Sequence, residues 1–152
     1  MKKQEIDHIL VRMLDFHRDV SDLNFTVGKP MQVESAGELI PVEIKPNFKA
    51  LSPFQTEILA LNLINQDRRL TETLLSQGSC DLSYALPGKA RFRVNIFKQR
   101  NSIAMVIRHI KTDIPAWEAL GLPKVLTDVI MSKRGLVLFA GATGTGKSTS
   151  LA

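Results

Sequence analysis

Cysteine is almost absent from this sequence of 152 residues, in which Cys80 is the only one. A single cysteine cannot close a disulfide within the chain, and its scarcity is typical of proteins from a reducing compartment. Long apolar runs are also missing. No stretch reaches the roughly 18 apolar residues of a membrane-spanning helix, and acids interrupt the amphipathic first residues where a signal peptide would be continuously apolar. We therefore expect a soluble cytoplasmic protein without a membrane span.

Acidic residues are missing from the segment 89–111, although the whole chain contains 15 of them. The net charge is +5, and a basic balance is typical of proteins that bind nucleic acid, acidic membrane surfaces or polyphosphates. Two interpretations stay open for this acid-free run: a solvated basic strand face, or an anion-binding site. Its cations are Lys89, Arg91, Arg93, Lys98, Arg100, Arg108 and Lys111.

Apolar periodicity predicts an α+β unit in residues 1–110. Residues 4–18 repeat apolar side chains at helical spacing, and Ser52 and Pro53 supply an N-cap and a first helical residue. Gly78 closes a further helix expected over 66–76. Short segments that alternate apolar and polar residues, separated by turn residues, predict antiparallel strands before and after these two later helices. The expected strands are 22–27, 31–34, 39–44, 80–86, 91–100 and 102–110.

The pattern changes after residue 110. Residues 111–118 contain Pro115 and form the expected linker, and Pro123 and Gly135 bracket a helix expected over 123–133. Residues 136–140 are a continuous apolar run, which is typical of a strand buried on both faces of a parallel sheet. We therefore predict that residues 119–152 begin a second domain with an α/β fold.

A phosphate-binding loop with the pattern G-x-x-x-x-G-K-S follows this apolar run directly. Glycines let the backbone wrap closely around phosphates, and successive N–H groups and the start of the next helix attract their charge. Lys147 is expected to contact the β- and γ-phosphates of ATP, and the Ser148 hydroxyl to ligate Mg²⁺. The alternative is a chance glycine-rich turn beside a surface lysine, which the preceding apolar strand disfavours. The loop residues are Gly141, Ala142, Thr143, Gly144, Thr145, Gly146, Lys147 and Ser148.

Little sequence follows the loop. Hydrolysis by P-loop proteins needs an acidic residue on a later strand for Mg²⁺ and a group that positions the attacking water, whereas four residues follow Ser148. We therefore predict that the 1–110 unit folds by itself, but that this chain alone shows no measurable hydrolysis and at best weak ATP binding.

Strand alternation over residues 91–100 places Arg91, Arg93 and Asn95 on one face and apolar residues on the other, which is expected to be core. Arg100 falls at the following turn, and Arg108 on the next strand. Guanidinium groups fit phosphate oxygens, and arginines stabilise phosphoryl transfer in trans. A solvated β face is the alternative, and the ATP loop in the same chain favours the nucleotide role.

Several segments occur in an order that resembles one known family: 21–28 (SDLNFTVG), 81–84 (DLSY), 91–95 (RFRVN), 97–100 (FKQR), 121–123 (GLP), and the P-loop followed by Thr149. They resemble the PilT family of type IV pilus retraction ATPases, or twitching motility proteins, within the secretion-ATPase superfamily. The resemblance covers nearly the whole chain. It implies a PAS-like N-terminal domain, an antiparallel sheet with helices, followed by the first strand and P-loop of a truncated RecA-like domain in which Thr149 also binds nucleotide.

The resemblance further implies a cytoplasmic hexamer at the inner membrane that hydrolyses ATP with Mg²⁺ and drives pilus retraction with a platform protein of that membrane. Arginines of the N-terminal domain would approach the nucleotide, and Arg93, Arg100 and Arg108 are the matching positions. A pilus assembly or type II secretion ATPase is one alternative, although such relatives usually carry further N-terminal domains. A basic nucleic-acid-binding module is the other; it needs exposed aromatic residues among its cations, and Phe92 falls on the apolar face.

Overall fold

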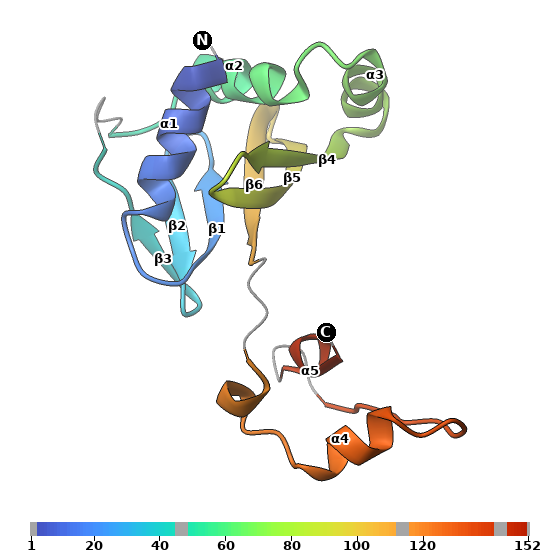
Figure 1. The fold of residues 1–152 in the computed structure, drawn as a ribbon. Coiled ribbons are helices and arrows are strands. Elements are labelled where there is room, and N and C mark those ends of the chain that lie inside the picture. The colour runs from blue at the N-terminus through green and yellow to red at the C-terminus, as the bar shows by residue number, and fades with distance from the viewer. Residues whose placement is uncertain (1–2, 45–48, 112–115, 142–145, 152) are drawn as a thin grey trace. The chain divides into compact units, whose positions relative to one another are not determined.

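The computed structural model describes residues 3–44, 49–111, 116–141 and 146–151, and its fold is shown in Figure 1. The chain divides into two compact units, Met1–Lys111 and Thr112–Ala152. No helix within the described residues is long and apolar enough to cross a membrane.

The first unit is built around one antiparallel sheet of six strands, in the order β3-β2-β1-β6-β5-β4 (Figure 1). All six strands expected from the alternation of apolar and polar residues are confirmed, with ends that differ by a few residues at most. The sheet joins two groups of strands that lie far apart in the sequence, because β1 pairs with β6 from Asp22↔Arg108 to Phe25↔Met105. The strands are β1 (Val20–Phe25), β2 (Gln32–Ser35), β3 (Glu38–Pro41), β4 (Ser79–Leu86), β5 (Ala90–Gln99) and β6 (Ser102–Ile110).

The helices of this unit are α1 (Lys3–Leu14), α2 (Pro53–Ile64) and α3 (Arg68–Gln77). The expected start of α2 is confirmed: the Ser52 hydroxyl accepts a hydrogen bond from the Gln55 N–H, and the Gln55 side chain accepts one from the Ser52 N–H. Gly78 closes α3 with a φ of 80°, a conformation that favours glycine. Local signals therefore predict these two helices well.

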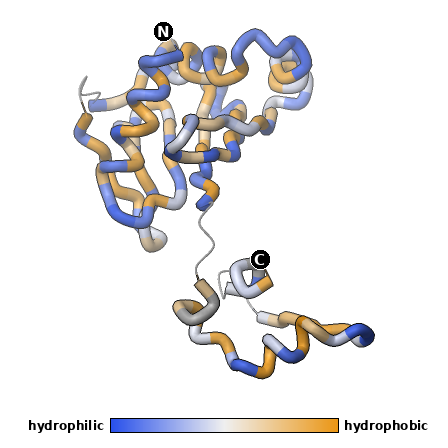
Figure 2. Tube along the Cα trace, viewed as in Figure 1, coloured by the Kyte–Doolittle hydropathy of each residue, from blue (hydrophilic) through white to orange (hydrophobic). Residues whose placement is uncertain are grey.

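The core lies between these helices and the apolar face of the sheet. Phe92 of β5, Leu23 of β1 and Met13 of α1 are fully buried and belong to one apolar cluster. Each buried side chain of this size contributes about 1.5–3 kcal/mol relative to an exposed one. Figure 2 shows apolar and polar residues interspersed along the elements of this unit. Because alternate residues of a strand face opposite sides, the polar set is left on the other face of the sheet.

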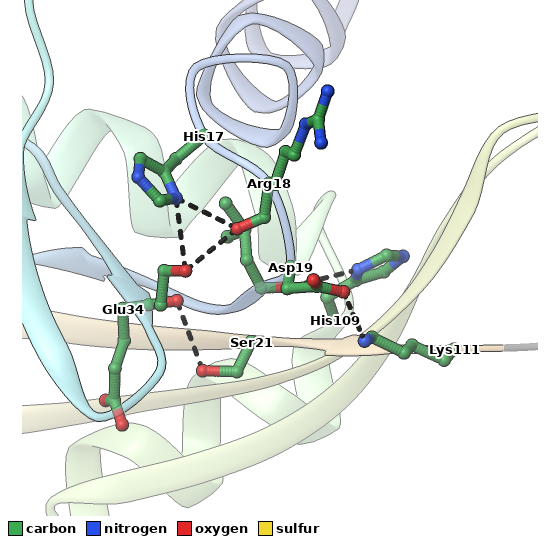
Figure 3. A network of polar contacts seen from close by, with 9 residues as sticks. His17, Arg18, Asp19, Ser21, Glu34, His109 and Lys111 are labelled. Carbon is green, nitrogen blue, oxygen red and sulfur yellow. Dashed lines mark hydrogen bonds and ion pairs between the residues drawn. The ribbon is translucent and has the colours of Figure 1, made fainter.

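The connection from α1 to β1 corrects the helix expected over residues 4–18. α1 ends at Leu14, and Asp19 has a positive φ of 54°, so the chain turns. Figure 3 shows contacts that hold the turn: the Ser35 hydroxyl donates to a backbone carbonyl oxygen of this connection at 2.8 Å, and His17 Nδ1 lies 3.1 Å from the same hydroxyl. His17 therefore lies outside the helix in which the apolar spacing had placed it.

The end of β6 is tied to the same turn (Figure 3). His109 Nδ1 lies 3.3 Å from the Val20 carbonyl oxygen, and Lys111 Nζ lies 2.9 Å from Asp19 Oδ1. The hydrogen bond and the charge of Lys111 lower the pKa of the exposed Asp19 carboxyl below its ordinary value. Because the backbone pairing of β1 with β6 ends at Asp22↔Arg108, these side chains extend the contact between the two strands.

Tyr84 connects the edge strand β4 to α1, because its hydroxyl donates a hydrogen bond to the Asp7 carboxylate. Burial, and then the hydrogen bond and charge of Asp7, raise the pKa of the Tyr84 phenol above its ordinary value of 10.0. A raised pKa in the folded state means that folding favours the neutral phenol. Its contribution to stability is complete below the unfolded-state pKa of 10.0 and is lost as the pH rises above that value.

We therefore expect the free energy of unfolding to fall as the pH rises above about 10, and to fall less steeply in the Tyr84→Phe variant, which has no phenol to ionise there. Urea denaturation of both proteins across this pH range measures the two slopes. Equal slopes would contradict the linkage between Tyr84 and stability.

The second unit contains a 3-10 helix, η1 (Trp117–Leu120), and two short helices, α4 (Val125–Ile130) and α5 (Lys147–Leu151). The helix expected over 123–133 is shorter at both ends, so Pro123 is not its first residue and Gly135 does not close it. Lys124 at its N-cap makes no side-chain capping hydrogen bond, so the start of α4 lacks the stabilisation that a capping serine or aspartate provides.

The strand expected over residues 136–140 is not formed, and that prediction is wrong for this structure: these residues have no regular secondary structure. A strand requires hydrogen bonds to a neighbouring strand, and every strand within the described residues lies in the first unit. Leu136 and Leu138 are 82% and 79% exposed. The apolar pattern indicates that this segment needs neighbouring strands and helices to bury its side chains. The described part of the second unit does not provide them.

Candidate nucleotide-contacting site

The predicted phosphate-binding loop belongs to the second unit. α5 begins at Lys147, as predicted, and the Ser150 N–H donates to the Gly146 carbonyl oxygen at 2.9 Å. Gly146 has a φ of 85°, at which a side chain would be strained, so this position favours glycine. Lys147 is half-buried, and Gly141 and Thr149 are exposed. Outside the described residues lie Ala142, Thr143, Gly144 and Thr145, and the side chain of Ser148 is also not described.

The predicted arginines lie on the face of the sheet opposite to the apolar core, which we call the open face. Along β5, Phe92 and Val94 are buried while Arg91 and Arg93 are exposed, which confirms the predicted alternation. Since directly paired residues of neighbouring strands point to the same side, Arg108 of β6 shares the open face with its partner Arg93.

Arg93 and Arg108 are directly opposed in the β5–β6 register, and such cross-strand side chains have Cβ atoms about 4.5–5.5 Å apart. They line a hollow of about 350 Å³, which we call the Arg93–Arg108 hollow. Two like charges placed so closely repel each other, so the arrangement needs nearby negative charge. The other lining residues are Asp22, Asp81, Asn95 and Val106.

A carboxylate compensates each of these guanidinium groups. Arg93 Nε lies 3.3 Å from Asp81 Oδ1, and Arg108 Nε lies 3.0 Å from Asp22 Oδ1. Both contacts use Nε, so the terminal nitrogens of both arginines are left without a protein acceptor among the described residues. Guanidinium groups bind oxyanions through such paired donors. The geometry therefore fits one oxyanion held between Arg93 and Arg108.

The run 89–111 is free of acids in sequence but not in space. Four of its seven cations form ion pairs with carboxylates from the α1–β1 connection, β1 and β4, which the sequence analysis did not assign to them. No local signal would have found three of these pairs, because they join residues 74, 86 and 92 positions apart, whereas Arg93 and Asp81 are 12 positions apart on the paired strands β5 and β4. The pairs are Lys89–Asp15 at 2.8 Å, Arg93–Asp81 at 3.3 Å, Arg108–Asp22 at 3.0 Å and Lys111–Asp19 at 2.9 Å.

Arg100 is not brought together with the other two predicted arginines. It lies in the turn between β5 and β6, where it lines a different hollow, whereas Arg93 lies seven positions earlier on β5. A strand rises about 3.3 Å per residue, so roughly 20 Å of β5 separates the two. The three matching positions therefore divide into one pair and one separate arginine.

No fully exposed aromatic ring lies among the cations of residues 89–111. Phe92 is fully buried, and Phe97 is half-buried. A surface that binds single-stranded nucleic acid combines its cations with exposed aromatic rings, so this observation disfavours the nucleic-acid-binding alternative.

No cluster of three or more potential metal ligands exists in the part of the chain that the structure describes. A Mg²⁺ ion bound with ATP needs no such cluster, because it takes one or two protein ligands and completes its shell with phosphate oxygens and water. The Ser148 hydroxyl fits that requirement chemically. The thiol of Cys80 offers no reactive site, since the residue is buried and burial, with a smaller contribution from Asp81, raises its pKa.

The two ion pairs of the Arg93–Arg108 hollow differ in burial, and this leads to a stability prediction. The Asp22 side chain is 8% exposed, whereas that of Asp81 is 53% exposed. We expect Arg108→Gln to lower the free energy of unfolding by about 1–3 kcal/mol, because it leaves a buried carboxylate without its partner. Arg93→Gln should change it by less than about 0.5 kcal/mol.

Urea denaturation of the 152-residue chain measures both effects. The double variant Asp22→Asn/Arg108→Gln removes the unpaired charge, and we expect it to recover most of the stability lost in Arg108→Gln. Equal losses for Arg93→Gln and Arg108→Gln would show that burial of Asp22 does not decide the outcome.

No family model matches the sequence. The chain is 44% identical over 132 residues to the type IV pilus ATPase PilU of Pseudomonas aeruginosa, which is 87% of this chain and 33% of PilU. It is 36% identical over 133 residues to the type IV pilus retraction ATPase PilT of the same organism, covering 87% of this chain and 37% of PilT. The chain therefore spans about a third of the length of these relatives.

Solved structures lead to the same group. The pilus retraction motor PilT with bound ADP matches 96% of this chain with a TM-score of 0.81 and 32% sequence identity, and the match covers 40% of that structure. The ATPase DotB of Legionella pneumophila matches the whole chain with a TM-score of 0.76 and 27% identity. Sequence and fold thus agree with the expected α+β unit and the start of an ATPase domain, and the chain belongs to the family of type IV pilus ATPases represented by PilU and PilT.

Proposed function

We propose that this chain is part of a motor subunit that couples ATP hydrolysis to type IV pilus retraction. The P-loop sequence, continued by α5 from Lys147, carries the proposal. Supporting it is the similarity to PilT, a retraction ATPase whose structure was solved with ADP. The domain organisation proposed for the chain is a PAS-like domain over 1–110, a linker over 111–118 and the start of a RecA-like ATPase domain over 119–152.

ATP with Mg²⁺ is the proposed ligand of the loop 141–149. Backbone N–H groups around Gly144 and Gly146 would cradle the phosphates, and the Lys147 ammonium would lie against the terminal ones. The Ser148 hydroxyl would ligate Mg²⁺, which neutralises charge as the phosphoryl group is transferred. These residues bind and orient the nucleotide, whereas activation of the attacking water needs groups that the loop itself does not contain.

The Arg93–Arg108 pair is the proposed second contribution to the chemistry. Phosphoryl transfer spreads negative charge over the oxygens of the moving group, and preorganised cations stabilise that charge. The terminal nitrogens of both guanidiniums are open to such an oxyanion, and Asp81 and Asp22 hold the arginines through Nε. Arg100, which matches a family position as well, lies too far along β5 to contact the same oxyanion at the same time.

A homo-hexamer is the proposed assembly, because the family resemblance puts arginines of one domain against nucleotide held by another. We place it in the cytoplasm, peripheral to the inner membrane at the pilus base, with a platform protein of that membrane as partner. The 152-residue chain alone is proposed to be inactive: residues 136–138 are exposed without strand partners, so the loop lacks a rigid support. Calorimetric titration with Mg-ATP and a phosphate-release assay test this last point, and micromolar affinity with steady turnover would overturn it.

A strain that lacks the gene tests the assignment to retraction. Loss of a retraction motor should abolish twitching while surface pili remain or accumulate, whereas loss of an assembly motor should remove the pili. Electron microscopy of surface pili together with a twitching assay separates these results, and the intact gene should restore the original phenotype. Pili that disappear would favour the assembly or secretion role, which is the second candidate.

A further inference from the structure

A second positively charged corner lies on the open face, at the opposite end of β5 from Arg93. Arg100 occupies the turn between β5 and β6, and Lys29 the turn after β1. Continuing the β1–β6 register beyond Phe25↔Met105 brings these two turns side by side. A hollow of about 440 Å³ lies between them, which we call the Lys29–Arg100 hollow. We propose that this hollow is a phosphate-binding site, separate from the P-loop and from the Arg93–Arg108 hollow.

Five of the eight residues that line the hollow have side chains that can donate hydrogen bonds, and the other three, Val27, Ile103 and Ala104, are apolar. No acid lines it, and within the described residues none of its five donor side chains has a hydrogen-bond or ion-pair partner. A phosphate group presents three or more acceptor oxygens and up to two negative charges, which such a set of donors can satisfy. The donors are Thr26, Lys29, Gln99, Arg100 and Ser102.

Four of the other six cations of the basic run have an acidic partner, whereas Arg91 and Lys98 have no carboxylate partner among the described residues. Lys89, Arg93, Arg108 and Lys111 each have a carboxylate within 3.3 Å. Asp81 of β4 and Asp22 of β1 thus compensate the two arginines of the Arg93–Arg108 hollow, whereas no acid lines the hollow at Lys29 and Arg100. Two nearby cations repel each other, and a bound anion relieves that repulsion.

Both cations project from turns whose backbone is held in place. The Lys29 N–H donates to the Thr26 carbonyl oxygen at 3.2 Å, and the Lys29 carbonyl oxygen accepts from the Leu51 N–H at 2.8 Å. The Arg100 turn is closed by the strand pair Gln99↔Ser102. Because the backbone of these turns is already ordered, less conformational entropy is lost when a ligand binds to them.

The conformation of Arg100 adds an independent observation. Its φ is 47° and that of Asn101 is 66°, as in the two-residue hairpin turns that normally carry glycine, asparagine or aspartate at both positions. Asn101 follows this preference, but Arg100 does not. A residue kept in a strained backbone conformation is a reason to look for a role of its side chain, and the hollow beside it supplies one.

The site is tested on the 152-residue chain by NMR titration with sodium phosphate at constant ionic strength. We expect saturable shifts of the amides of residues 26–29 and 99–102. Lys29→Gln/Arg100→Gln should raise the Kd at least about tenfold, since charge-assisted hydrogen bonds are lost. Arg91→Gln is the matched control, because Arg91 is an exposed arginine of the same face that does not line the hollow.

Two further experiments distinguish this site from the P-loop and identify the source of the phosphate. Lys147→Ala should leave the shifts at 26–29 and 99–102 intact, so failure of the P-loop assignment would not be mistaken for failure of this site. Co-sedimentation uses phosphatidylcholine vesicles with and without phosphatidylglycerol. Retention on the anionic vesicles that is lost in the double variant and kept in Arg91→Gln identifies a lipid headgroup; phosphate shifts without retention identify a soluble phosphate compound.

The proposal is overturned if phosphate up to about 20 mM causes no saturable shift at these residues, since a site of millimolar Kd would then be nearly filled. It is also overturned if Arg91→Gln weakens binding as much as the double variant does, because the effect would then be one of net charge. Circular dichroism of each variant confirms that the turns are altered without unfolding the chain.

Discussion

Lys147→Ala in the full-length protein is expected to lower the rate of ATP hydrolysis by about 100-fold or more, because it removes a cation that stabilises charge developing on the transferred phosphoryl group. Lys147 begins α5 directly after Gly146, whose positive φ ends the loop. Its position is therefore set by the loop itself. Phosphate release at saturating Mg-ATP measures the loss, and a titration with ATP separates weaker binding from slower turnover.

Lys133→Ala is the matched control for Lys147→Ala. Lys133 is an exposed lysine of the same unit that lies outside the P-loop motif, so its replacement removes the same charge without touching the proposed site. We expect an unchanged rate. Hydrolysis by Lys147→Ala within a few-fold of the original rate would show that this loop is not the nucleotide site.

Arg93→Gln in the full-length protein is expected to lower the maximal rate of hydrolysis by about 1,000-fold, which is the lower end of what an arginine in trans contributes to phosphoryl transfer. The Arg93 side chain is 67% exposed and its carboxylate partner Asp81 is exposed as well. Folding therefore depends little on it, and a lower rate would report a lost contact with the reacting phosphate. Steady-state kinetics and thermal denaturation are measured on the same preparation.

Two comparisons make the Arg93 result specific. Arg91→Gln removes an exposed arginine from the same face and strand, but outside the Arg93–Arg108 hollow, and should leave the rate unchanged. Asp22→Asn/Arg108→Gln should reproduce the loss of rate with most of the stability restored. If Arg93→Gln turns over normally, or if Arg91→Gln is equally slow, the hollow is not where these arginines act.

Much of the first unit could be predicted because its signals are local. The Ser52–Gln55 capping box and Pro53 specify the start of α2 within one turn of helix, and alternation along β5 separates Arg93 from its buried neighbours. The predictions from sequence were wrong where a contact with residues far away in the chain decides the local structure. Apolar spacing continued beyond Leu14, but the Ser35 hydroxyl binds the backbone after α1 and the chain turns there.

The second unit shows more clearly that a local pattern does not by itself decide the structure of a segment. The apolar residues 136–140 have the composition of a buried strand, yet a strand exists only through hydrogen bonds to another strand. In the described residues of that unit no strand is present, so the segment has no regular structure despite its sequence. The phosphate-binding motif could still be recognised, because its chemistry depends on the spacing of residues within one short loop.

The sequence by itself determined the starts of α2 and α5, the faces of the strands and the P-loop motif, since each depends on residues only a few positions apart. The tertiary structure alone decided which charges meet. Arg108 pairs with Asp22, 86 residues away, because β1 lies beside β6 in the sheet. Strand order and register depend on how all helices and strands share one core, and no window of neighbouring residues contains that information.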